Sequence, residues 1–276
     1  TELNNAQGEN RSLSLEALGM DTEAERHLMS LWASCPFRCD ARKIKETCME
    51  TYFGGFQIRS IPVIMEPRQG AGFAGERKQQ IVLNFDGKGT LSDVCIALAS
   101  TKLRGETQAM EVTEARKRLL ILDFVEQFRT AYNRKDTAFM ERIFSEDALI
   151  ITGTVSKAPL KSADGPAAVT FREKEKARIN VLSKEQYLKK LGEVFRKNEW
   201  INVLFDNIKI QKHGKKETYG VQLAQTWTSS TYGDKGYLFL LWDFEDIDNP
   251  KIHVRAWQPD GTPEVERYGL ADFKGF

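Results

Sequence analysis

The chain has 276 residues and a mass of 31.4 kDa, with 41% hydrophobic and 29% charged residues. These are ordinary globular values that suggest neither disorder nor a fibrous chain, and two domains are the better expectation for this length. The net charge of +1 argues against a general nucleic-acid-binding protein, which carries a clear basic excess. No apolar run approaches the roughly 20 residues that cross a bilayer, so no transmembrane segment is expected.

The N-terminal part opens on a polar stretch and then turns helical. Residues 1–20 are rich in asparagine and predict a flexible arm. The apolar spacing from Thr22 to Ser34 predicts a helix. A second helix is predicted from Asp40 to Phe53, on a spacing of four residues carried by Ile44, Cys48 and Tyr52.

Three strands are predicted next, with a hairpin turn at Asp86–Gly87 between the second and the third. The stretch Gly70–Gly75, before the second strand, matches G-x-G-x-x-G, which is a dinucleotide fingerprint only where it opens a helix. Here a strand-like run follows, so we interpret it as a flexible hairpin loop and expect no nucleotide site. The three strands are Phe56–Met65, Gln80–Phe85 and Thr90–Ala99.

The cysteines and histidines do not have the spacing of a metal site. Cys35 and Cys39 are separated by three residues, which fits neither a thioredoxin-type motif nor a zinc knuckle. Buried free thiols are slightly favoured over one or two disulfides in an oxidising compartment. No metal and no cofactor are expected, because none of the ligand pairs that zinc requires is formed by His27, His213 and His253.

A polar connector at 101–112 is the predicted domain boundary. It divides the chain into the arm at 1–20, a small α+β domain at 21–112 and a second domain at 113–276. Limited proteolysis is expected to cut this connector and to leave a stable fragment of residues 113–276.

The second domain begins with a strongly helical pattern. A helix is predicted from Glu114 to Asn133, and Asp136 can cap a short helix from Thr137 to Phe144. A strand is predicted at Leu149–Thr154. The apolar stripe of the long helix consists of Ala115, Leu119, Leu122, Val125, Phe128 and Tyr132.

A capping box and an interrupted strand follow. Lys157–Ala168 is loop-like, and Val169–Val181 suits a charged strand or hairpin on a solvated surface. Ser183 and Gln186 form a capping box, which predicts a helix that reaches Asn198. The strand from Trp200 to Gln211 is expected to be broken near Asp206–Asn207, as in a β-bulge.

Three antiparallel strands in series are predicted between Tyr219 and Pro259. The run Tyr237–Phe244 is apolar on both faces, so we expect helices to cover one face and a partner surface the other. Strict alternation places Val221, Leu223, Gln225 and Trp227 opposite Gln222, Ala224, Thr226 and Thr228. In the last strand it places Ile252, Val254 and Ala256 opposite His253, Arg255 and Trp257.

This order of elements resembles the nuclear transport factor 2-like superfamily, including its SnoaL-like branch. The resemblance covers 113–276 and is carried by the stretch 119–153 (LLILDFVEQFRTAYNRKDTAFMERIFSEDALIITG) and the run 183–260. The end of the chain is similar to uncharacterised bacterial members, often exported. An exported protein whose signal has been removed is therefore expected, with a cytoplasmic protein as the alternative. No family is recognised for residues 1–112.

The resemblance implies an α+β fold: a cone-like, strongly curved antiparallel sheet wrapped around three helices. It also implies a pocket at one end of the cone and a homodimer through the sheet. The superfamily includes dehydratases, isomerases and epoxide hydrolases beside many members without catalytic activity, so the fold does not decide the function.

Asp243 and His253 are the candidate catalytic residues, because burial would raise the pKa of a strand-end Asp and a His is poised near neutrality. The alternative, which we favour, is that Asp243 ends a strand in a solvated acidic turn at 243–250 while His253 and Arg255 lie on the outer face of the sheet. That turn lacks the residue order of a calcium loop.

The aromatic residues of the three-strand region are read first as core and second as the lining of a pocket. Our first hypothesis is a non-enzymatic module that binds a small apolar or aromatic ligand or a protein partner. The alternative is a lyase, isomerase or hydrolase that uses an Asp or His base. The candidate ligand-binding residues are Trp227, Tyr232, Tyr237, Trp242, Arg255 and Trp257.

Overall fold

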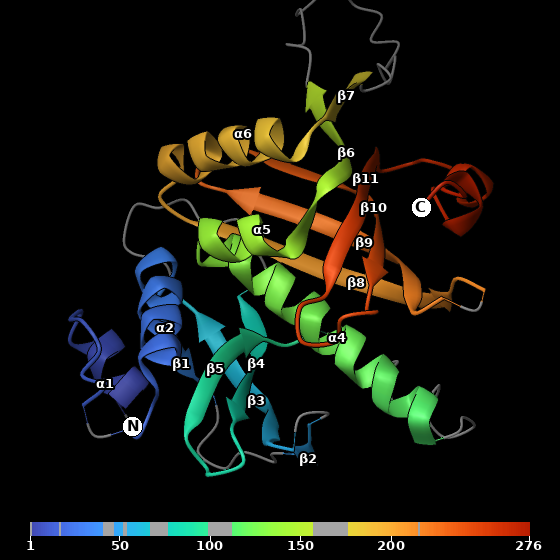
Figure 1. The fold of residues 1–276 in the computed structure, drawn as a ribbon. Coiled ribbons are helices and arrows are strands. Elements are labelled where there is room, and N and C mark those ends of the chain that lie inside the picture. The colour runs from blue at the N-terminus through green and yellow to red at the C-terminus, as the bar shows by residue number, and fades with distance from the viewer. Residues whose placement is uncertain are drawn as a thin grey trace, which may run out of the picture.

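The computed structural model contains two sheets, with a long helix lying between them (Figure 1). The N-terminal residues build one sheet, and the C-terminal residues build the larger, curved one. The structure describes residues 2–16, 18–40, 47–51, 54–66, 77–98, 112–156, 176–214 and 216–276.

The N-terminal sheet has the strand order β1-β3-β4-β5, with β2 paired to the other end of β3. Helix α2 packs against β5, and the sheet and helices share a core that includes Leu31, Phe37 and Val63. The predicted strands and the hairpin at Asp86–Gly87 are confirmed. The elements are α1 (Glu2–Gly8), α2 (Thr22–Ser34), β1 (Phe37–Cys39), β2 (Thr47–Glu50), β3 (Phe56–Met65), β4 (Lys78–Phe85) and β5 (Leu91–Ile96).

Two predictions for this part were wrong. The stretch 40–53 is not one helix, because Thr47–Glu50 forms strand β2 and pairs antiparallel with β3. Its exposure alternates with the period of two that a strand requires, so sheet pairing overrides a weak helical spacing. The expected arm instead contains α1, and Ala6, Leu13 and Leu15 are buried in the core. The glycine-rich loop and nearly all of the connector lie outside the described residues.

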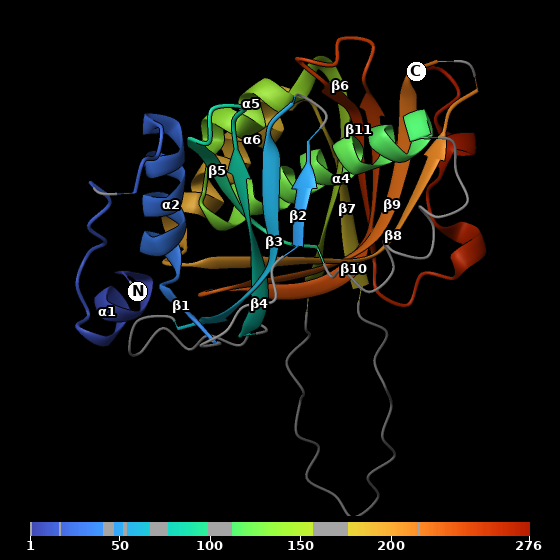
Figure 2. The ribbon, with the colours of Figure 1, turned by 90° about the horizontal axis from the view of Figure 1, so that it is seen from below.

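The C-terminal sheet has the strand order β7-β6-β11-β10-β9-β8. Neighbouring strands are antiparallel except for β6 and β11, which are parallel. The sheet curves around α4, α5 and α6, which gives the predicted α+β cone (Figures 1 and 2). The elements are α4 (Val112–Asn133), α5 (Thr137–Ile143), β6 (Phe144–Ser156), β7 (Lys176–Leu182), α6 (Lys184–Lys197), β8 (Ile201–Lys212), β9 (Thr218–Ser229), β10 (Gly233–Asp243) and β11 (Lys251–Pro259), followed by the short 3-10 helices η1 (Glu264–Glu266) and η2 (Leu270–Asp272).

Local sequence signals account for the boundaries of these elements. Asp136 accepts a hydrogen bond from the Phe139 amide and caps α5. Ser183 and Gln186 form the predicted capping box at the start of α6. The register of β8 against β9 shifts between Asp206 and Lys209, which confirms the predicted bulge.

Helix α4 is buried on both sides. Val125, Phe128 and Tyr132 pack into the core beneath the C-terminal sheet, as the predicted stripe requires. Its polar side faces the N-terminal sheet, as the contacts of Glu126 with Arg59 and with the Leu98 amide show. That sheet lies across the helix (Figure 2). Buried Glu126 and Arg129 on that side would be solvated in an isolated helix, so the N-terminal sheet supplies their surroundings.

A buried polar network fastens the two sheets to α4. Arg59 of β3 forms a two-pronged ion pair with Glu126, whose carboxylate also accepts the Leu98 amide at 2.8 Å. Arg129 donates to the carbonyl oxygens of Ala97 (2.6 Å) and Val203 (2.7 Å), and therefore connects the N-terminal sheet to strand β8. Buried charges remain stable only when they are paired in this way.

Asp123 lies in the same network, and its raised pKa predicts that the free energy of unfolding depends on pH. Burial, and then the neighbouring Glu126 charge, raises the pKa of Asp123 to about 7. Because this pKa is higher in the folded than in the unfolded chain, the folded protein binds the extra proton, and this contribution to stability declines from pH 4 to pH 7. Asp123→Asn should flatten the pH dependence of the unfolding free energy in that window, measured by urea denaturation. An unchanged slope would contradict this assignment.

Candidate functional site

The two faces of the C-terminal sheet are covered by different parts of the chain. On β10, Leu238, Leu240 and Trp242 belong to the core under the helices, which we call the inner face. Phe239 and Leu241 belong to a second cluster on the opposite, outer face. Residues 260–276, called the C-terminal segment, pack on this outer face (Figure 1).

The chain's own C-terminal segment covers part of the outer face, where a partner surface was predicted. The Phe273 ring stacks on Phe239 with centroids 5.2 Å apart and planes 10° apart. Gly220 makes room for Leu270, since a Cβ at this position would lie 2.8 Å from the Leu270 side chain. The chain thus covers the apolar patch around Phe239 itself, and a homodimer through the sheet remains a prediction.

Strict alternation was wrong for β11, because the strand contains an irregularity. The register of β11 shifts between Ile252 and Val254 against both of its neighbours. Ile252 therefore lies on the inner face with Trp257, whereas Val254 and Ala256 face the outer cluster. One extra residue in a strand reverses the side-chain alternation beyond it, and the sequence did not reveal where this happens.

Asp243 and His253 contact each other at the rim of the sheet. The Oδ2 atom of Asp243 lies 3.2 Å from Nε2 of His253, and both side chains are 26% exposed. The other ring nitrogen of His253 is 3.7 Å from the exposed carboxylate of Asp147. The pair has the geometry of a partly solvated hydrogen bond.

Arg255 lies at the centre of a buried aromatic cluster on the inner face. Its Nε donates to the Tyr132 hydroxyl at 3.2 Å, and its guanidinium carbon lies 5.4 Å from the centre of the Tyr187 ring. The hydroxyls of Tyr132 and Tyr187 are 2.7 Å apart, and the Trp227 ring packs edge-on against Tyr132. Burial raises the pKa of Tyr187 well above its ordinary value, so its hydroxyl stays protonated.

The remaining predicted ligand residues are dispersed. Tyr232 donates to Asp234 at 2.7 Å, and burial raises the pKa of that carboxyl group. Trp242 lies deep in the core against Phe124 and Phe128, and Tyr237 lines the outer face. The six predicted residues therefore do not form one site.

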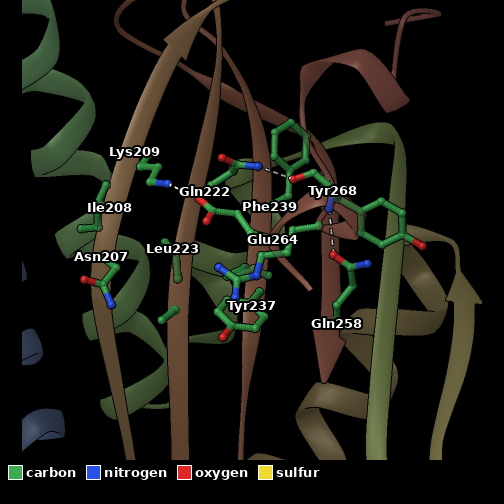
Figure 3. Close-up of a pocket in the computed structure, with 13 residues that line it drawn as sticks. Asn207, Ile208, Lys209, Gln222, Leu223, Tyr237, Phe239, Gln258, Glu264 and Tyr268 are labelled. Atoms are coloured by element: carbon green, nitrogen blue, oxygen red, sulfur yellow. Dashed lines mark hydrogen bonds and ion pairs between the residues drawn. The ribbon is translucent and has the colours of Figure 1, made fainter. Parts of the chain in front are cut away.

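A cavity of about 430 Å³ opens on the outer face (Figure 3). We call it the outer-face cavity. It lies where the β8 bulge, the small side chain of Ala224 and the C-terminal segment leave a hollow. Its lining consists of Asn207, Ile208, Lys209, Gln222, Leu223, Ala224, Tyr237, Leu238, Phe239, Gln258, Glu264, Arg267 and Tyr268.

Two glutamines hold the C-terminal segment at the border of this cavity (Figure 3). The amide of Gln222 donates to the Tyr268 carbonyl at 2.7 Å. The Gln258 side chain accepts the Tyr268 amide at 2.8 Å. It also donates to the Glu266 carbonyl at 2.9 Å. These side-chain bonds to backbone fix the position of the segment against the sheet.

The charged groups of the cavity come from the segment and from β8. Lys209 and Glu264 form an ion pair at 2.7 Å, and the pKa of Glu264 is lowered by that hydrogen bond, by the Lys209 charge and by the nearby Arg267 charge. The Arg267 guanidinium lies over the Tyr237 ring, 3.5 Å from its centre, and its Nε donates to the Thr262 carbonyl at 3.1 Å. Of the residues that line the outer-face cavity, only Tyr237 is among the ligand-binding candidates predicted from the sequence.

The described part of the chain contains neither a metal-ligand cluster nor a membrane-spanning helix. There, no group of three or more His, Cys, Asp or Glu side chains could hold a metal ion. No helix in the same residues is long and apolar enough to cross a membrane. All four cysteines are free thiols, and burial raises the pKa of Cys35 to about 12.

No protein-family model and no curated protein matches this sequence. Among solved structures, an NTF2-like protein from Cytophaga hutchinsonii has 16% identity and a TM-score of 0.38, covering 51% of this chain and 97% of its own. A putative scytalone dehydratase from Novosphingobium aromaticivorans has 16% identity and a TM-score of 0.39, covering 56% and 100%. Bd1075 from Bdellovibrio bacteriovorus has 12% identity and a TM-score of 0.39, covering 84% and 99%. Identities and TM-scores this low carry no conclusion about activity, and the cone fold follows from the strand order and the helices that the sheet encloses.

Proposed function

We propose, from a C-terminal half that has the α+β cone fold of nuclear transport factor 2-like proteins, that this protein is a non-enzymatic small-molecule-binding module. The outer-face cavity is the proposed site. Its volume of about 430 Å³ falls within the range of about 300–1,000 Å³ that is typical of ligand pockets. Aromatic walls with a few oriented polar groups are the usual composition of such sites.

The composition of the cavity supports binding over catalysis. Among its described lining residues Glu264 is the one carboxylate, and it is ion-paired with Lys209. The alternative, a lyase, isomerase or hydrolase, needs a base that can reach the bound molecule. Asp243 and His253, the candidates for that role, are not among the lining residues.

The inner cluster around Arg255 is better explained as packing. Tyr132, Tyr187 and Trp257 are each at most 5% exposed. The outer-face cavity, lined mostly by partly exposed side chains, is open to a small molecule from the surface. The hypothesis that the outer face binds a protein partner is less favoured, because the C-terminal segment already covers the apolar patch at Phe239.

Filling the cavity should abolish binding. Ala224→Phe places a ring in the hollow, whereas Thr226→Phe places the same ring on the same face of β9 outside the described lining. We expect aromatic fragments to shift the melting temperature of the wild type and of Thr226→Phe, and not that of Ala224→Phe. Equal shifts in all three proteins would contradict the proposed site.

A further inference from the structure

We infer that the outer-face cavity selects a small aromatic carboxylate. This inference rests on the proposed function, because it concerns the ligand of the same cavity. Three features of the cavity support it: a pre-positioned arginine, a net positive lining and aromatic walls.

Arg267 is held in one orientation before any ligand arrives. Its guanidinium is stacked 3.5 Å from the centre of the Tyr237 ring, and its Nε is bonded to the Thr262 carbonyl. Neither Nη atom donates to any residue in the described part of the chain. A planar guanidinium with two parallel N–H donors matches a carboxylate, and prior fixation reduces the entropy lost on binding.

The charge balance favours a single negative charge. Glu264 is ion-paired with Lys209, and the nearby Arg267 charge also acts on it, so the three charged groups of the lining together carry one positive charge. A single net positive charge suits a monoanion. A phosphate group with two charges is usually met by more donors, for example several basic groups or a helix N-terminus.

The walls of the cavity add a preference for a ring. Tyr237, Phe239 and Tyr268 all contribute to the lining. Aromatic surfaces bind planar rings by stacked or edge-on contacts. A ring with one carboxylate would satisfy the walls and Arg267 together.

The test compares benzoate, benzyl alcohol, acetate and inorganic phosphate by NMR titration of the full chain. Benzoate should bind at least about tenfold more tightly than benzyl alcohol, as a hydrogen-bonded charge predicts, and more tightly than acetate or phosphate. Arg267→Gln should remove the advantage of benzoate over benzyl alcohol. Arg196→Gln, an exposed arginine on α6, is the matched control and should change neither affinity.

The outcomes separate this inference from the proposed function. Equal affinities for benzoate and benzyl alcohol, both lost in Ala224→Phe, would overturn the carboxylate preference and leave the binding site intact. Tighter binding of phosphate than of benzoate would also overturn it. No aromatic probe binding at all would overturn both.

Discussion

Replacing Glu126 with glutamine should lower the free energy of unfolding by about 3–5 kcal/mol. Glu126 is fully buried, pairs with Arg59 and accepts the Leu98 amide. Removing its charge leaves a guanidinium that is 17% exposed without its directly bonded counter-ion, and that loss is much larger than the value of an ordinary surface pair. Urea denaturation followed by circular dichroism measures the change.

The matched control is Glu146→Gln. Glu146 pairs with Lys184 at 2.6 Å, but its side chain is 93% exposed. Such surface pairs contribute about 0–1 kcal/mol. If Glu126→Gln were as mild as Glu146→Gln, the polar network would not be what joins the N-terminal sheet to α4. The same network predicts that residues 113–276, cut from the rest, are less stable than first expected.

Deleting residues 260–276 should make the chain self-associate. The deletion uncovers the apolar patch that Phe273 and its neighbours cover on the outer face, and exposed apolar sheet surface favours association. It should also destabilise the fold, since loss of a single buried Phe costs about 3–5 kcal/mol. Analytical ultracentrifugation measures the mass, and thermal unfolding measures the stability.

A second shortened chain tests whether the uncovered patch causes the self-association. Phe239→Lys places a charge at the centre of the uncovered patch, so the shortened chain with this substitution should return to a monomer. A shortened chain that stays monomeric, with an unchanged melting temperature, would show that the C-terminal segment does not protect this face.

The sequence was informative where local chemistry decides the structure. Ser183 and Gln186 begin α6, Asp136 caps α5 and Asp86–Gly87 turns a hairpin, because each signal acts within a few residues. The strand order of the cone agrees with the predicted series of strands, whose alternation holds along β9.

The features that the sequence did not predict depend on contacts between residues that are distant in the chain. Strand β2 exists because β3 lies beside it, and not because Thr47–Glu50 favours a strand alone. The burial of Glu126 and Arg129, which no local pattern indicates, results from the packing of the N-terminal sheet on α4. The bulge in β11 reverses the alternation at His253, which single-strand reasoning cannot locate.

The outer-face cavity could not be predicted for a related reason. Its polar residues come from β8, β9, β11 and the C-terminal segment, which are distant in sequence. No short motif joins Lys209, Gln222 and Arg267. Only the folding of the segment back over the sheet brings them together.

A crystal structure of the full chain grown with benzoate tests most directly whether the outer-face cavity binds an aromatic carboxylate. We expect the ring in the outer-face cavity beside Tyr237, with its carboxylate on the Nη atoms of Arg267. Benzoate bound instead at the inner cluster beside Arg255, with the outer-face cavity empty, would contradict it.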